Sequence, residues 1–254
     1  MRPLKMAATM VLGLTLGMPV QGHAAEYQLK EPYLYIVEAQ QTNPASADDM
    51  PVYKPRRPSP PPIGPRGRVG GGIRGGGGKG PELLALTPDH VGFTKREQPA
   101  LFWYLSETTS LPIEFTLVDS RVIRPILETR INTPTKPGVQ RISLRDFGVT
   151  LPSGVPYKWF ITLVIDPEAP SRNIIAGGTI ERVDLVEALT IHLSYPGTKE
   201  AVRAYAEAGL WYDAIEIISD MIEASPNDPD LRCRRAFLMK QVKLLAIAKN
   251  DCKE

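Results

Sequence analysis

The sequence predicts a mainly β protein with an α-helical tail. It comprises a fibronectin- or immunoglobulin-like antiparallel sandwich over residues 82–183 and a helical tail over residues 184–254, both preceded by a disordered linker. Two observations predict this class. Short apolar runs separated by Pro, Gly and Asn turns give about seven strands, the number and spacing typical of a sandwich. After residue 183 the apolar residues recur every three or four positions, which is the period of a helix.

The first residues have the order of a secretory signal peptide. Two basic residues precede an apolar run that ends at Val20, and small residues follow. This order predicts cleavage after Ala24, with Ala25 as the near alternative, and export to the periplasm or cell envelope. A membrane anchor is the alternative, but a span needs ~20 apolar residues and this run holds ~15. No later stretch is apolar enough to span, and we expect residues 25–50 to be poorly ordered.

Residues 51–81 form a linker that contains eight Pro and ten Gly. A segment of this composition buries too little apolar surface to offset the entropy of ordering, so it is expected to be disordered. Its charge is one-sided, which favours either a solvated spacer or a tether that contacts an anionic polymer. Nucleic acid is the least expected polyanion for an exported protein. The seven basic residues are Lys54, Arg56, Arg57, Arg66, Arg68, Arg74 and Lys79.

The expected strands cover residues 83–86, 101–105, 113–117, 122–131, 139–144, 157–165 and 174–183. Pro125 places its strand at a sheet edge, because proline cannot donate to a ladder. Leu151, Gly154 and Tyr157 have the spacing of a tyrosine corner, in which a phenol caps backbone groups at the entry to a late strand. Trp159 stands where antibody domains have a cysteine, so this sandwich is expected to lack their disulfide. Alternate residues from Tyr157 to Ile165 should form a core stripe.

Four helices are expected, at about residues 185–193, 198–209, 211–224 and 230–249. The segment around the second and third resembles one degenerate tetratricopeptide repeat. In this interpretation Gly209 ends one helix, Trp211 opens the next, Ala214 allows close packing, and Pro226 starts the following unit. One repeat is too little for an independent solenoid, so the tail should pack on the sandwich or on a partner.

Cys233 and Cys252 are 19 residues apart in the sequence. One continuous helix would hold them about 28 Å apart, whereas a disulfide needs Cα atoms within about 7 Å. Three possibilities follow: both are reduced, they pair between molecules, or the last helix breaks after Ala248 and folds back.

The sequence contains no constellation typical of catalysis, and we predict no catalytic residue, no cofactor and no metal site. A nucleophile elbow is lacking, and two His and two Cys lie too far apart in the mature chain for the short spacings of a zinc site. The alternative is an envelope hydrolase that uses the surface carboxylates Asp119, Asp166 or Glu168.

Several blocks resemble a bacterial exported family known only as a domain of unknown function. They are residues 86–88, 92–94, 99–105, 114–119, 157–159, 178–183 and 209–214, and the resemblance extends from Leu83 to Pro229. It implies a secreted sandwich with a helical appendix and supplies no reaction. The sequence therefore predicts a noncatalytic exported interaction module that meets an unidentified protein or envelope partner.

Overall fold

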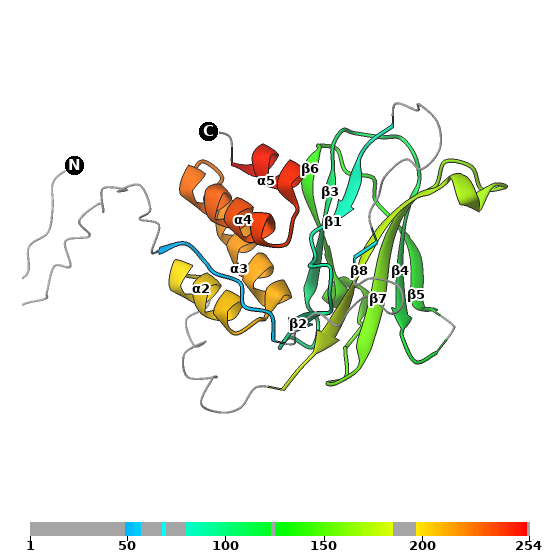
Figure 1. Ribbon diagram of the computed structural model, residues 1–254. Helices are drawn as coiled ribbons and strands as arrows, with labels where there is room; N and C mark the ends of the chain where they lie inside the picture. The colour runs from blue at the N-terminus through cyan, green and yellow to red at the C-terminus, as the bar shows by residue number, and fades with distance from the viewer. Residues whose placement is uncertain (1–48, 57–67, 70–79, 123–124, 185–196, 253–254) are drawn as a thin grey trace, which may run out of the picture. The chain divides into compact units, whose positions relative to one another are not determined.

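The computed structural model describes residues 49–56, 68–69, 80–122, 125–184 and 197–252 (Figure 1). Within these ranges eight strands precede four α-helices, which confirms the predicted mainly β class with an α-helical tail. The strands are β1 (Leu83–Ala85), β2 (Gly92–Thr94), β3 (Ala100–Leu105), β4 (Ile113–Asp119), β5 (Pro125–Ile131), β6 (Gly138–Ser143), β7 (Pro156–Leu163) and β8 (Ile174–Arg182). Short 3-10 turns lie at Leu144–Phe147 (η2) and Pro170–Arg172 (η3).

The strands form two sheets, one in the order β1-β3-β6 and the other in the order β2-β8-β7-β4-β5. Every neighbouring pair is antiparallel except β2 and β8, which run parallel. The prediction of a purely antiparallel sandwich is therefore wrong at β2. The sequence does not predict this strand, because the three residues Gly92–Thr94 are too few to display an alternating pattern.

Alternation of side chains explains the cores of β4 and β7. In both strands every second residue is buried and the residues between are partly exposed. Tyr157, Trp159, Ile161 and Leu163 form the predicted stripe, but Ile165 is exposed because β7 ends at Leu163. The predicted edge position of Pro125 is confirmed, since β5 is the last strand of its sheet.

The Leu151–Tyr157 segment leads into β7, which begins at Pro156. Gly154 has φ +74°, a left-handed conformation that favours glycine. Leu151 and Tyr157 are both buried on either side of that turn.

Strand β3 is buried along its whole length. Leu101, Trp103 and Leu105 alternate with Phe102 and Tyr104, so the two sets lie on opposite faces of the sheet. Helix α3 (Trp211–Ala224) packs against β3, and Asn250 in the last helix donates a hydrogen bond to the Tyr104 hydroxyl at 2.9 Å. The three-stranded sheet therefore lies between the five-stranded sheet and the helices, which explains the unbroken apolar run of β3.

The remaining helices are α2 (Lys199–Glu207), α4 (Pro229–Gln241) and α5 (Leu245–Asp251). Thr198 is the N-cap of helix α2, and its hydroxyl accepts the Ala201 N–H at 3.1 Å. The expected continuous helix over 230–249 is wrong: the chain turns between α4 and α5, with Lys243 at φ +62°. The helix expected at 185–193 lies outside the described residues.

The start of α3 is fixed in the core by two aromatic residues. The Trp211 Nε1–H donates to the Leu86 carbonyl at 2.9 Å. The Tyr212 hydroxyl accepts from Trp159 Nε1 at 2.9 Å, donates to the Thr179 carbonyl at 3.1 Å and lies 2.9 Å from the Thr87 hydroxyl. Burial raises the pKa of Tyr212 far above its usual value. The helical tail is thus docked on the sandwich.

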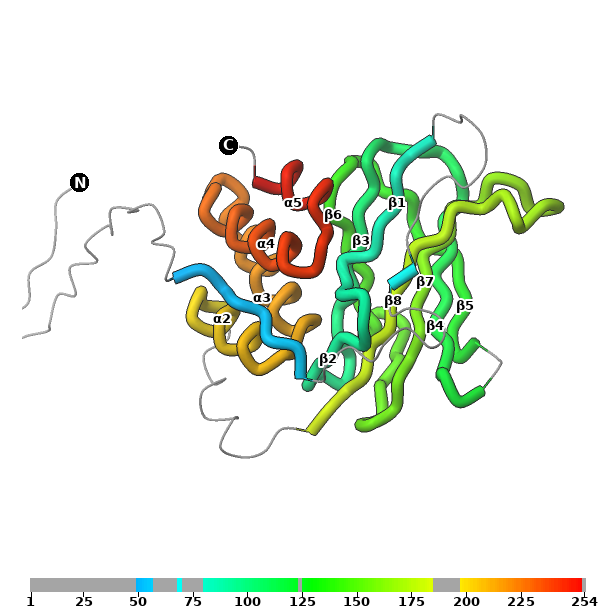
Figure 2. Tube along the Cα trace, in the orientation of Figure 1, coloured from blue at the N-terminus to red at the C-terminus, as the bar shows by residue number. Residues whose placement is uncertain are grey.

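Residues 49–56, here called the strap, run across the helices α2 and α4 (Figure 2). The Tyr53 N–H donates to Gln241 Oε1 at 2.8 Å, and the Lys54 N–H donates to the Ala206 carbonyl at 3.1 Å. The Tyr53 ring packs edge-on against the Trp211 ring, with 5.0 Å between the ring centroids. The expectation of disorder from residue 51 is therefore wrong for the strap, because a buried tyrosine and paired backbone groups supply the packing that composition alone did not indicate.

Candidate functional site

A groove of about 770 Å³ lies between the three-stranded sheet and the helices. Strands β3 and β6 contribute Phe102, Tyr104 and Val139, and the loop before β6 contributes residues 134–137. Ile222 of α3 and Ile247 of α5 line the helical side. The groove therefore combines a mainly polar lining, with a few apolar and aromatic side chains at its base, and an adjacent sheet edge.

Charged side chains make up much of the polar lining. They are Lys136, Arg141, Arg232 and Arg235 against Glu223 and Asp251. Both carboxylates face arginines: Glu223 lies 3.7 Å from Arg141, and Asp251 forms two short contacts with Arg235. Both carboxylates are therefore engaged by cations of the same lining. The lining has an excess of positive charge.

The helical wall of the groove is covalently fixed. Cys233 of α4 and Cys252, just after α5, form a disulfide with their Cα atoms 4.6 Å apart. Beside it, Arg235 donates to both oxygens of Asp251 at 2.8 and 2.7 Å, and both side chains are buried. Of the three possibilities for the cysteines, folding back within the chain is correct. The break lies at residues 242–244, earlier than Ala248.

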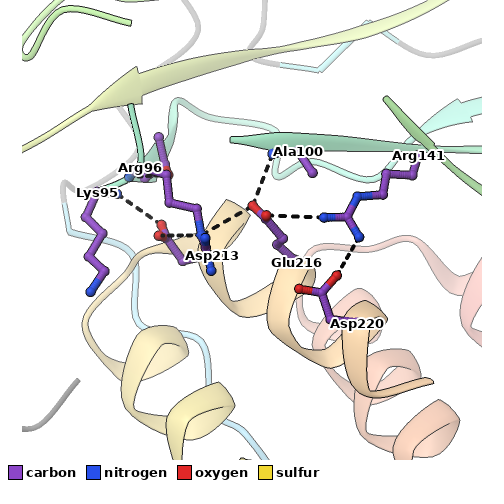
Figure 3. Close-up of polar contacts among 8 residues, drawn as sticks. Lys95, Arg96, Ala100, Arg141, Asp213, Glu216 and Asp220 are labelled. Carbon is purple, nitrogen blue, oxygen red and sulfur yellow. Dashed lines mark hydrogen bonds and ion pairs between the residues drawn. The ribbon is translucent and has the colours of Figure 1, made fainter. Parts of the chain in front are cut away.

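Acidic residues on one face of α3, which also belongs to the helical wall, attach this helix to the sheet (Figure 3). The Glu216 carboxylate accepts the Ala100 N–H at 3.0 Å and lies 3.3 Å from Arg141. Asp213 accepts the Lys95 N–H at 3.1 Å. These contacts attach α3 to the sheet before the helix reaches the groove.

Asp213 is the most perturbed acid of this face. Its side chain is fully buried, and this burial raises its pKa to about 7, although the Lys95 N–H and the nearby Arg96 act in the opposite direction. The Arg96 Nε lies 3.7 Å from Asp213 and 3.4 Å from Glu216. Asp213 does not line the groove, so its role is to anchor α3.

Residues 69–252 match the model of a family described as Domain of Unknown Function (DUF928). The chain belongs to this family. The DUF928 match includes all the described strands and helices and both cysteines. It extends past both ends of the segment from Leu83 to Pro229, over which the sequence resembles such a family. No curated protein matches the chain.

Three of the predicted linker cations lie among the described residues next to the folded body of the DUF928 protein. Arg68 donates to the Val242 and Thr87 carbonyls at 2.9 and 3.2 Å, which gives it a structural role. Lys54 lies 3.8 Å from Glu207, and the Arg56 backbone passes close to Gly209. The expected anion contacts Arg57, Arg66, Arg74 and Lys79 lie outside the described residues.

The motif residues of the predicted repeat lie at the junction of α2 and α3. Gly209 has φ +72°, and a Cβ there would come within 2.6 Å of the Lys54 carbonyl oxygen. Ala214 and Trp211 are fully buried, and Pro226 lies between α3 and α4. These residues shape the scaffold of the DUF928 domain and do not line the groove.

The carboxylates of the alternative hydrolase are not brought together. Asp119 is opposite Tyr157 at one end of the β4–β7 ladder, and Ile113 is opposite Leu163 at the other. Asp166 and Glu168 follow that second end, so roughly 20 Å of strand separates them from Asp119 at ~3.4 Å per residue. Asp119 is bound by Arg121 and Asp166 by Arg172. This arrangement offers no carboxylate pair across one cleft.

The sequence did not identify Arg141, Arg235 or Asp251, because their importance depends on contacts between distant segments. One signal was present: Asp213, Glu216, Asp220 and Glu223 recur at steps of three and four, which places them on one helix face. Among the described residues of the DUF928 chain, no cluster of three or more His, Cys, Asp or Glu could hold a metal ion. Nor is any helix in those same ranges long and apolar enough for a membrane span.

Proposed function

We propose that this protein is a noncatalytic exported interaction module of the cell envelope that binds a segment of a protein partner in the groove beside β6. The groove carries the proposal. Its polar lining with arginines, the tyrosine and apolar side chains at its base, and its rigid walls have the composition and order of surfaces that bind proteins.

Two further features support export and binding. The apolar run near the N-terminus has the layout of a signal peptide, and paired cysteines are typical of oxidising compartments outside the cytosol. In this proposal the two sheets form an immunoglobulin-like sandwich that carries the groove. The α2–α3 pair acts as a single tetratricopeptide-like hairpin that forms part of the scaffold.

The test is site-specific photo-crosslinking in the cells that produce the protein. A photoreactive residue at position 136, in the groove, should give one discrete adduct whose partner mass spectrometry identifies. The matched control is position 240, an exposed lysine of α4 outside the groove. The substitution Arg232→Glu should abolish the adduct at position 136, because it removes a groove cation that is itself partly exposed.

Equal labelling at positions 136 and 240, or an adduct that survives R232E, would reject the groove as the binding site. Enzymatic turnover of a purified envelope glycan or peptide by the protein would reject the noncatalytic assignment.

A further inference from the structure

Strand β6 presents one side of its backbone away from its own sheet. The Leu144 N–H donates to the Pro99 carbonyl at 3.1 Å, which identifies that pair as hydrogen-bonded. In an antiparallel ladder such pairs alternate. By the observed register Ile142, Gln140 and Gly138 therefore face β3, and the N–H and C=O groups of Val139 and Arg141 point outward.

These outward groups have no protein partner in the part of the chain that the structure describes. Strand β6 is the last strand of its sheet, and no backbone or side-chain hydrogen bond found among the described residues reaches the backbone of Val139 or Arg141. Ser143 differs, because it is the N-cap of η2 and its carbonyl faces that turn. The same strand lines the groove from Gly138 to Arg141. Unpaired donors and acceptors thus border the groove.

The other long edge of the fold is protected, which makes β6 distinctive. Strand β5 begins with Pro125 and exposes Glu128 and Arg130. Prolines and exposed charges prevent pairing with a further strand. Strand β6 contains no proline, and its one charged residue, Arg141, is already engaged by Asp220 and Glu216. The remaining edges, β1 and β2, are three residues long.

The charges of the groove indicate what an added strand would carry. Asp251 is already held by Arg235, and Arg232 lies 3.9 Å from it. Lys136 forms no ion pair with any described residue. A partner side chain with a carboxylate would complement these two cations.

We propose that the partner adds an extended segment to β6 as a fourth strand of the β1-β3-β6 sheet, with an acidic side chain directed at Lys136 and Arg232. This inference rests on the proposed function and specifies its mode. Main-chain bonds to Val139 and Arg141 give affinity, and alternate side chains of the segment enter the groove.

The experiment selects binders from a randomised heptapeptide library displayed on phage, with the purified, oxidised protein as target. Enriched peptides should alternate apolar and polar residues and contain an acid. The substitution Val139→Pro removes one outward N–H and no bond to β3, so it should weaken the selected peptide roughly tenfold. Arg130→Pro makes the same change on the β5 edge and should leave affinity within about twofold.

A second measurement leaves the protein unchanged. Methylating single backbone nitrogens of the selected peptide should abolish binding at every other position and be tolerated between them, because only alternate amides face β6. Enrichment of peptides with apolar spacing of three and four, uniform tolerance of N-methylation, or no enrichment would overturn strand addition. A dimer that Val139→Pro dissolves, with no peptide bound, would overturn it in favour of a second copy.

The two proposals fail separately. If the crosslinked adduct at position 136 requires Arg232 but survives Val139→Pro, the groove binds its partner through side chains alone. The proposed function then stands and strand addition is rejected.

Discussion

Removing the Cys233–Cys252 disulfide should cost the protein about 3 kcal/mol of unfolding free energy. The bond closes a loop of 19 residues, and the chain-entropy relation for a loop of that length gives about 11 cal/mol/K, or roughly 3 kcal/mol at 25 °C. For a folded region of this size, that loss corresponds to a fall in melting temperature of about 6–12 °C.

The perturbation is the double substitution Cys233→Ser with Cys252→Ser, compared with the oxidised protein by calorimetry and urea unfolding. Treating the natural protein with a reductant should reproduce the variant's melting temperature, whereas the variant itself should not respond. A difference below about 0.5 kcal/mol would refute the reasoning, since α5 would then be held by its buried Ile247 and by the Arg235–Asp251 pair alone.

Four other outcomes are expected. Tyr212→Phe leaves the buried Trp159 N–H without its acceptor and should destabilise the fold by about 2–3 kcal/mol in urea unfolding. Burial raises the pKa of Asp213 to about 7 in the folded state, whereas its unfolded value is near 4. Between pH 4 and pH 7 the native protein therefore binds one proton more than the unfolded chain does. Stability should fall as pH rises through that window, by no more than about 1.4 kcal/mol per pH unit, and D213N should flatten the profile. Gly209→Ala should cost about 1–2 kcal/mol, because φ is positive there and the strap carbonyl leaves no room for a methyl group; thermal melting measures it. Intact mass of the exported protein should show cleavage after Ala24.

The local patterns of the sequence identified most of the strands and helices because each depends on neighbours in the chain. The alternation in β7, the edge position of Pro125 and the left-handed Gly154 are all consequences of short-range geometry. The three-residue strand β2 carries too few residues for such a pattern, and its parallel partner β8 is far away in the sequence.

The groove could not be predicted in the same way. Its lining comes from β3, β6 and three helices, and it exists only because the chain turns back at Lys243. The positive φ there gives no sequence signal in a lysine, so the sequence predicts one helix where the structure has α4 and α5. Composition also misled at the strap, where a buried tyrosine in a Pro-rich stretch docks together with paired backbone groups.

The strap also constrains the order in which the molecule can be completed during synthesis. Asp49 contacts Arg234, and the Tyr53 N–H pairs with Gln241, across 185 and 188 residues. The strap residues are therefore synthesised well before their partners in α4. Complete docking of the strap therefore requires α4, and a truncation before α4 would leave the strap with only its contacts to Ala206 and Trp211.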